Sequence, residues 1–222
     1  MTSTPLQAVV FDLDGLMFNT EDLYDRVGDI LLQRRGHRFT KELKDKIMGL
    51  PGYKSWPIFI EHCRLQDTPQ ELQDESDAIF EEILGPNLQT MPGLVELLAA
   101  LEQNDLPKAI ATSSRRSFVE KVLTPFSYQD RFAFVLSAED VTEGKPNPEI
   151  YLTAAERLGI SPAQMMVLED SQNGCKAAVA SGAFAVAVPN HHTQHHDFQG
   201  AKLVAETLAD VRIYRALGAS LE

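Results

Sequence analysis

The chain of 222 residues contains little cysteine: it has only Cys63 and Cys175, which form no CxxC pair. Two distant thiols supply neither the disulfide framework of a small secreted domain nor a set of zinc ligands, so we interpret them as reduced thiols of a cytoplasmic protein. Basic residues are also few, with 20 Lys and Arg against 32 Asp and Glu and a formal net charge of -12. This balance argues against non-specific binding to nucleic acid or to an anionic membrane, because both need a basic patch.

Long hydrophobic runs are missing as well. The first apolar run, Leu6 to Phe11, ends at Asp12 and follows no basic segment. It is too short for the core of a signal peptide and far short of the ~20 residues that span a membrane. The remaining composition, 44% hydrophobic and 23% charged residues, is typical of a globular protein. At ~150 residues per domain, the length predicts one domain, or one domain with an insertion.

Short apolar runs without polar alternation recur along the chain and predict parallel strands that are covered on both faces. These runs are residues 8–11, 109–111, 134–136, 165–168 and 184–188. Stretches with helical spacing lie between them, and residues 94, 97, 98 and 101, all leucine, form one apolar stripe. Because strands and helices alternate, the sequence predicts an α/β fold with a doubly wound parallel sheet.

Helix boundary signals support this alternation. The segment Ser161 to Gln164 combines a cap, a proline at the first helical position and a capping-box glutamine, and so predicts a helix start. Gly159 and Gly182 stand where a helix would have just ended.

The regular alternation is interrupted between about residues 16 and 89, where helical signals occur without strand-like runs. Leu23, Val27 and Leu31 share one side of a predicted helix, and Thr68 to Glu71 is a second capping box with proline at the first position. The interruption is too long for a plain loop. We therefore predict a sheet domain from residues 1–16 and 90–220 and a small all-helical domain from residues 17–89.

Polar residues follow several of the predicted strands, and in an open α/β sheet ligands bind outside the carboxyl ends of the strands. The candidate site residues are Asp12, Asp14, Thr112, Ser113, Ser114, Lys145, Glu169 and Asp170. Carboxylates brought so close together raise one another's pKa, so the cluster predicts a bound cation. Oxygen ligands favour Mg²⁺, which bridges readily to a substrate phosphate, while hydroxyls, backbone N–H groups and a lysine suit the phosphate itself.

Four segments carry a resemblance to a known family. FDLDG (residues 11–15), ATSS (111–114), GKPNP (144–148) and LEDSQNG (168–174) resemble, in order and spacing, the four motifs of the haloacid dehalogenase (HAD) superfamily. Within it, the chain is similar to the β-phosphoglucomutase and pseudouridine-5′-phosphatase group. The resemblance implies a Rossmann-like core with a helical cap. It also implies a Mg²⁺-dependent phosphatase that hydrolyses a small phosphorylated metabolite through an aspartyl-phosphate.

The resemblance also implies roles for individual residues. Asp12 would be the nucleophile, and Asp14 the acid and base that protonates the leaving oxygen and then activates water. The phosphoryl oxygens would be held by Thr112, the backbone N–H of Ser113, and Lys145. Mg²⁺ would be held by Asp12, the backbone carbonyl of Asp14, Asp170, and Glu169 directly or through water.

Two other functions stay open. A phosphomutase would return the phosphoryl group to a sugar, but Tyr24 stands where β-phosphoglucomutases carry a histidine. The segment from Met48 to Gly52 also lacks their phosphate-binding arginine, although Lys54 is near enough to replace it. A catalytically silent binding protein is the other alternative, and the intact acidic motifs argue against it.

Several single residues have two interpretations. Ser114 is either a helix cap or a phosphate ligand, and Lys145 is either a phosphate ligand, as its motif indicates, or a solvated loop lysine. Asn19 replaces an aspartate that family members commonly have. The four histidines between His191 and His196 lie in a predicted loop, and we expect no physiological metal there.

Overall fold

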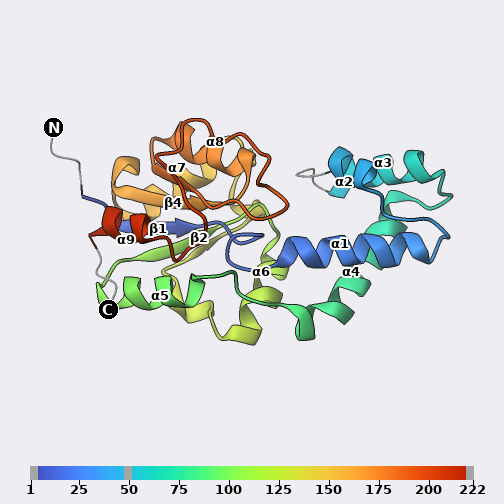
Figure 1. Cartoon of the computed structure of the whole chain (residues 1–222), viewed down its shortest axis with the longest axis horizontal. Helices are drawn as coiled ribbons and strands as arrows, with labels where there is room; N and C mark the ends of the chain where they lie inside the picture. Colours follow the sequence, from blue (N-terminus) through green and yellow to red (C-terminus); the bar gives the residue numbers. More distant parts are fainter. Residues whose placement is uncertain (1–4, 48–51, 219–222) are drawn as a thin grey trace. The chain divides into compact units, whose positions relative to one another are not determined.

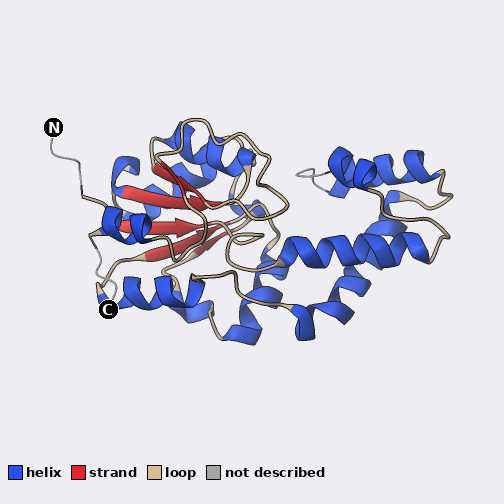
Figure 2. Cartoon of the chain, viewed as in Figure 1, coloured by secondary structure: helices blue, strands red, loops and turns tan. Residues whose placement is uncertain are grey.

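The computed structural model describes residues 5–47 and 52–218. The chain divides into two compact units. One is built from the segments up to Asn19 and from Gln89 onward, and the other from Thr20–Leu88. We call the first unit the core and the second the cap. Figure 1 shows the cap in the blue-to-green part of the chain, and Figure 2 shows the strands within the core.

A parallel sheet of six strands, counted over the described residues, forms the centre of the core in the order β3-β2-β1-β4-β5-β6. The strands are β1 (Ala8–Phe11), β2 (Lys108–Ala111), β3 (Val135–Leu136), β4 (Met165–Glu169), β5 (Phe184–Ala187) and β6 (Leu203–Val204). Phe11 at the end of β1 pairs with Ile110 of β2 and Leu168 of β4. The order of the strands reverses its direction at β1 and β4, the place where open α/β sheets bind ligands.

Helices cover both faces of this sheet (Figure 2). They are α5 (Leu94–Gln103), α6 (Arg116–Leu123), α7 (Glu149–Leu158), α8 (Gln172–Ser181) and α9 (Val211–Leu217). In Figure 1, α7 and α8 lie on one face and α5 on the other. Small side chains such as Ala109, Ala154 and Ala178 fill the layer under α7 and α8, so these helices approach the strands closely and bury them.

The cap contains α1 (Thr20–Gln33), α2 (Lys41–Ile47), α3 (Gly52–Cys63) and α4 (Pro69–Asn87). Helix α1 packs against α4 and buries the predicted stripe that includes Leu23 and Leu31. Helix α4 begins with the predicted capping box, in which Glu71 N–H donates to Thr68 Oγ1 at 3.2 Å and Thr68 N–H donates to Glu71 Oε2 at 2.7 Å.

The structure confirms the predicted α/β fold with a doubly wound parallel sheet, and it adds features that the sequence patterns did not predict. Strand β6 was not predicted because two residues are too few to show a period. The Ser161 to Gln164 capping box forms, but the helix after it is one 3₁₀ turn, Pro162–Gln164, because β4 begins at the next residue. Gly159 and Gly182 do end α7 and α8, in left-handed conformations with φ of 67° and 83°.

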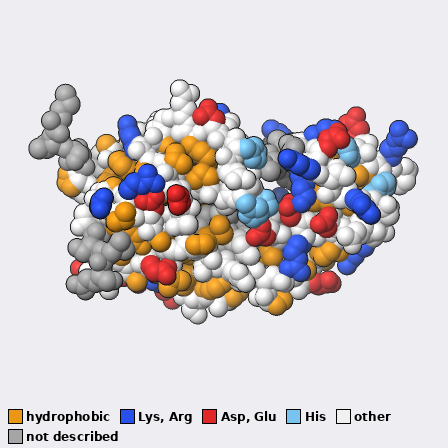
Figure 3. Space-filling model, in the orientation of Figure 1, with side chains coloured by type: hydrophobic (Ala, Val, Ile, Leu, Met, Phe, Trp, Pro, Cys, Tyr) orange, Lys and Arg blue, Asp and Glu red, His pale blue; other side chains and the backbone are white. Residues whose placement is uncertain are grey.

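Among the helices of the described ranges, none combines the length and apolarity needed to cross a bilayer. Figure 3 shows that Lys and Arg side chains are interspersed with Asp and Glu on the face in view.

Candidate active site

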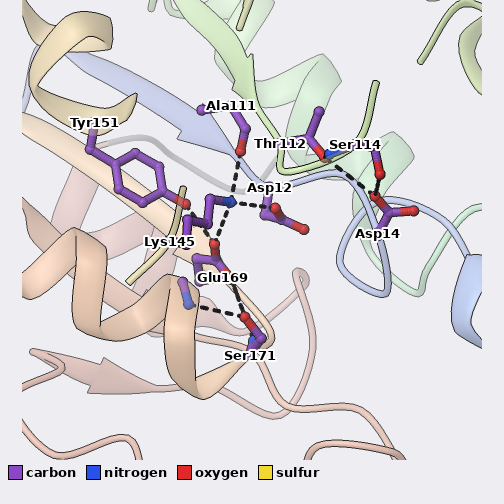
Figure 4. A network of polar contacts seen from close by, with 10 residues as sticks. Asp12, Asp14, Ala111, Thr112, Ser114, Lys145, Tyr151, Glu169 and Ser171 are labelled. Carbon is purple, nitrogen blue, oxygen red and sulfur yellow. Dashed lines mark hydrogen bonds and ion pairs between the residues drawn. The ribbon is translucent and has the colours of Figure 1, made fainter. Parts of the chain in front are cut away.

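The carboxyl ends of β1, β2 and β4 bring the predicted site residues together (Figure 4). Asp12 follows β1, Thr112 follows β2, and Glu169 is the last residue of β4. Because these three parallel strands are neighbours in the sheet, residues far apart in the sequence meet at one edge. The loop that leads into α7 supplies Lys145 to the same edge.

Lys145 lies at the centre of the cluster. Its ammonium group donates to Asp12 Oδ1 at 2.5 Å, to Glu169 Oε1 at 2.7 Å and to the backbone carbonyl of Ala111 at 2.9 Å. The side chain is only 5% exposed. Burial disfavours its charged form, but the attraction of Asp12 and Glu169 outweighs burial and raises its pKa well above the usual value. Lys145 is therefore a fixed buried cation and not a solvated loop lysine.

For Asp12, in contrast to Lys145, burial outweighs the neighbouring opposite charge and disfavours the ionised form. Loss of solvent raises the pKa of its carboxyl well above the ordinary value; Lys145 opposes this shift, while Glu169 and Asp14 reinforce it. A further cation beside Asp12 would favour the carboxylate form. The site therefore has an electrostatic place for a second positive charge.

Asp14 occupies a more open position and is held by hydroxyl groups. Ser114 Oγ donates to Asp14 Oδ2 at 2.6 Å, and Thr112 Oγ1 donates to the same oxygen at 3.3 Å. The Ser114 backbone N–H in turn donates to Thr112 Oγ1 at 3.0 Å. Ser114 does not cap α6, whose N-cap position is Arg115, so the helix-cap interpretation is wrong. The side chain of Ser114 instead fixes the orientation of Asp14.

Three carboxylates fit a divalent cation. Asp12, Glu169 and Asp170 are buried, and each can place one oxygen within 4.8 Å of the others'. The loop after β1 is shaped around Asp170, because a Cβ at Gly15 would lie 2.6 Å from Asp170 Oδ2. Asn190 Nδ2 donates to Asp170 Oδ2 at 2.9 Å and to the Gly15 carbonyl at 3.0 Å, and so fixes this carboxylate. Oxygen ligands of this kind suit a hard cation.

Glu169 is also held by neutral donors. Tyr151 Oη donates to its Oε1 at 2.6 Å, and Ser171 Oγ donates to its Oε2 at 3.1 Å. The carboxyl group lies against the first turn of α8, where a Cβ at Gly174 would come within 1.8 Å of Glu169 Oε1. Only a glycine at position 174 leaves room for this carboxylate.

A small cavity adjoins the cluster. It measures about 140 Å³ and is lined by Thr112, Ser113, Ala138, Val141, Thr142, Gly144, Lys145 and Ile150. The three residues predicted to bind phosphate are all among these. The cavity is large enough for a group of a few atoms.

Several of these contacts were not predicted from the sequence. Tyr151 falls on the apolar side of a helix and is indistinguishable there from a packing aromatic. Asn190 follows β5 in a loop, with no motif to mark it. Ser171 carries a recognisable sequence signal, because serine is a typical residue at the start of a helix. In the structure it caps α8 by accepting from Gly174 N–H at 3.1 Å.

Asn19 and the histidine-rich loop both make contacts with the backbone of the core. Asn19 Oδ1 accepts from the backbone N–H of Gln89 at 2.7 Å, a role that an aspartate would fill equally well. In the histidine-rich loop, His196 Nδ1 accepts from the backbone N–H of Gln172 at 3.2 Å and thus serves the start of α8.

The chain is similar to several known proteins. Residues 9–188 match the family described as haloacid dehalogenase-like hydrolase. A probable pseudouridine-5′-phosphatase of Drosophila melanogaster is 35% identical over 211 residues, which cover 91% of this chain and 90% of the relative. A phosphorylated carbohydrates phosphatase of Thermotoga maritima is 32% identical over 181 residues, covering 80% and 82%. A Thermotoga maritima structure provisionally described as a beta-phosphoglucomutase has a TM-score of 0.81 and 26% identity, covering 95% and 99%.

Proposed function

The chain belongs to the haloacid dehalogenase-like hydrolase family and is a phosphoric monoester hydrolase; on that premise we propose that it acts through an aspartyl-phosphate on Asp12, with Mg²⁺ as its metal. The observation that carries the proposal is the contrast between two nearby aspartates. Asp12 is buried against the Lys145 ammonium, whereas Asp14 is half-buried and held by the hydroxyls of Thr112 and Ser114. Two carboxyls in unlike environments suit the separate roles of nucleophile and proton donor.

In the first step, the Asp12 carboxylate attacks phosphorus. A bond forms between its oxygen and phosphorus while the bond from phosphorus to the leaving oxygen breaks, and Asp14 gives its proton to that oxygen. Ser114 and Thr112 support this step because they keep Asp14 Oδ2 in one place. In the second step, water attacks phosphorus and Asp14 takes its proton. Phosphate leaves and the Asp12 carboxylate is regenerated.

Positive charge must oppose the charge of the phosphoryl group during both steps. Lys145 supplies a fixed ammonium, and Thr112 and Ser113 face the adjoining cavity with further donors. Asp12 and Asp170 would hold Mg²⁺ with the backbone carbonyl of Asp14, and Glu169 would do so directly or through water. When bound, the metal ion neutralises phosphoryl charge and keeps Asp12 ionised.

For the substrate, we propose a small phosphomonoester of a sugar or a nucleoside-like alcohol, in the cytoplasm. The two curated relatives support these classes, since one is named for pseudouridine-5′-phosphate and the other for phosphorylated carbohydrates. We propose no nucleic acid and no membrane as partner, consistent with the net charge of -12.

A phosphomutase is the second candidate, favoured by the likeness to the Thermotoga maritima structure. The residue at the position of the mutase histidine is Tyr24, whose ring packs on Phe80 within the cap with ring centres 4.8 Å apart. A tyrosine has no equivalent of the two imidazole nitrogens. The segment Met48 to Gly52, where mutases place an arginine for a second phosphate, lies outside the described residues except for its last position. The tyrosine supports hydrolysis over transfer.

The test is phosphate release from pseudouridine-5′-phosphate, uridine-5′-phosphate, hexose phosphates, glycerol phosphate and a generic aryl phosphate. We expect Mg²⁺-dependent turnover that excess EDTA abolishes and added Mg²⁺ restores. Ca²⁺ should inhibit, because it takes more ligands at longer distances and occupies carboxylate oxygens that the chemistry needs. Full activity in EDTA would refute the metal assignment.

A product analysis separates the candidates. The enzyme is incubated with β-glucose-1-phosphate and a trace of glucose-1,6-bisphosphate, and glucose-6-phosphate is measured alongside inorganic phosphate. We expect phosphate release to dominate with the substrates of the panel. Faster formation of glucose-6-phosphate would identify a mutase, and no turnover of any substrate with any metal would favour a binding protein.

A further inference from the structure

The hydroxyl group of Tyr151 needs an explanation beyond packing. Tyr151 is 0% exposed and lies on α7 among Ile150, Ala154 and Ala155, all members of the apolar layer between helix and sheet. A phenylalanine would fill the same space. A buried hydroxyl is costly unless it is hydrogen-bonded, so the contacts of Tyr151 Oη show what it contributes.

Those contacts lead directly to the charged cluster (Figure 4). Tyr151 Oη donates to Glu169 Oε1 at 2.6 Å, and Lys145 Nζ donates to the same oxygen at 2.7 Å. The Lys145 ammonium also lies 5.1 Å from the centre of the Tyr151 ring, within the range of a cation–π contact. Tyr151 therefore contacts both members of one ion pair, from a helix that supplies neither of them.

The position of Lys145 depends on this arrangement. An ammonium has three N–H donors, and here they point to Asp12, Glu169 and the Ala111 carbonyl. The lysine side chain is long and flexible, so its head is only as fixed as the acceptors around it. Glu169 is one of these acceptors, and its Oε1 is itself fixed by Tyr151.

We propose that Tyr151 is a positioning residue, whose hydroxyl fixes Glu169 and, through Glu169, holds the Lys145 ammonium beside Asp12. The expected effect on catalysis rests on the proposed function, in which Lys145 opposes the charge of the phosphoryl group. Tyr151 itself does not touch the reacting atoms. Its removal should therefore weaken the alignment of the cluster and leave the packing of α7 intact.

Tyr214 offers a matched control. It is also a buried tyrosine on a core helix, at 1% exposure, and its hydroxyl makes no hydrogen bond to any described residue. Tyr214→Phe therefore removes the same atom without removing a described contact. A difference between the two variants reports the bond to Glu169 and not the general effect of losing a buried hydroxyl.

The first experiment measures kcat and KM for Tyr151→Phe, Tyr214→Phe and the wild type, with thermal unfolding to confirm that each is folded. Loss of a group that orients a ligand or charge commonly lowers activity 10- to 100-fold, and we expect a loss of about that size in kcat for Tyr151→Phe. KM should change less, and Tyr214→Phe should stay within about twofold of the wild type. Equal kinetics for the two variants would overturn the proposal.

The second experiment needs no activity. Proton–nitrogen NMR tuned to lysine ammonium groups should show a slowly exchanging signal for Lys145, identified by its loss in Lys145→Met. In Tyr151→Phe this signal should exchange faster with water or vanish, while Tyr214→Phe should keep it. An unchanged signal in Tyr151→Phe would refute the positioning role. If the wild type hydrolyses no substrate, the proposed function fails, but the NMR comparison still decides the role of Tyr151.

Discussion

Lys145 in the core and Arg35 in the cap are both cations held between two acidic side chains, in very different surroundings. Arg35 donates to Asp67 and to Glu75, each at 2.6 Å, and its side chain is 17% exposed. Lys145 lies between two buried carboxylates of the candidate active site and is 5% exposed. Each cation contacts two carboxylates, so the two sites can be compared for the effect of burial, which is the largest cause of the pKa shift at Asp12.

The carboxyl groups show that effect clearly. In the cap, the hydrogen bond from Arg35 lowers the pKa of both Asp67 and Glu75. In the core, burial raises the pKa of Asp12 even though Lys145 opposes it. A cation therefore stabilises a half-buried carboxylate at little cost, whereas a fully buried carboxylate beside a cation still carries a desolvation penalty. Such a penalty is more easily explained by chemistry than by stability.

Replacing the buried carboxylate should give the largest functional effect. Asp12→Asn removes the proposed nucleophile, and we expect activity below about one ten-thousandth of the wild type, the scale on which loss of a nucleophile acts. The unfolding midpoint should stay within about 4 °C, because the amide keeps an acceptor for Lys145 at a site where charge is disfavoured. Phosphate release measures the activity, and melting followed by circular dichroism measures the unfolding midpoint. Activity within tenfold of the wild type would remove Asp12 from its role.

Removing the buried cation should give the largest loss of stability. Lys145→Met leaves two buried carboxylates facing each other, and we expect a loss of about 3–5 kcal/mol in the free energy of unfolding. Urea denaturation in EDTA measures it without compensation by metal. The matched control is Lys44→Met, which breaks the more exposed cap pair with Asp25 and should cost about 1 kcal/mol or less. Equal losses for the two variants would contradict the argument from burial.

The cap network should give a smaller effect on stability and none on chemistry. Arg35→Met removes the contacts with Asp67 and Glu75, and we expect about 1 kcal/mol of destabilisation with kcat unchanged within about twofold. The neighbouring Arg34→Met, which removes only a contact between Glu75 and a half-exposed side chain, should cost less. Urea denaturation of both variants tests the order of their stability losses, and kinetics test whether kcat is unchanged. A large loss of kcat in Arg35→Met would mean that the cap network serves the site.

The sequence predicted the fold better than the boundaries of its elements. Five apolar runs were recognisable as strands because burial on both faces removes polar residues from them. Strand β6 was missed because Leu203 and Val204 alone show no pattern. The capping box at Ser161 signals a helix start without signalling the helix length, since the following strand decides where the turn ends.

For the site, motif residues were predictable and their supports were not. Asp12, Lys145 and Asp170 stand in short segments with recognisable spacing, so their meeting could be expected from the strand ends. The hydrogen bond from Ser114 to Asp14 spans 100 positions, and Tyr151 reaches Glu169 across 18. These supporting contacts depend on the register of neighbouring elements, which no local pattern encodes.

The smallest predicted effect concerns Glu102. It tests whether burial, or location in the core or the cap, decides how the pKa of a carboxyl group shifts beside a cation. Glu102 belongs to the core but is 42% exposed, and hydrogen bonds from Arg131 and Lys108 lower its pKa to about 2. A lowered pKa contributes stability above the ordinary value of 4.5, and this contribution is lost as the pH falls toward about 2. Glu102→Gln should therefore cost less than about 1 kcal/mol at pH 7, after allowance for solvent screening, and the gap should narrow with acid. Urea denaturation of both proteins from pH 7 down to about pH 3 measures the gap. If the difference in unfolding free energy between the two proteins instead grows as the pH falls, Glu102 behaves like the buried carboxyl groups of the site. Burial would then no longer explain the contrast between the core and the cap.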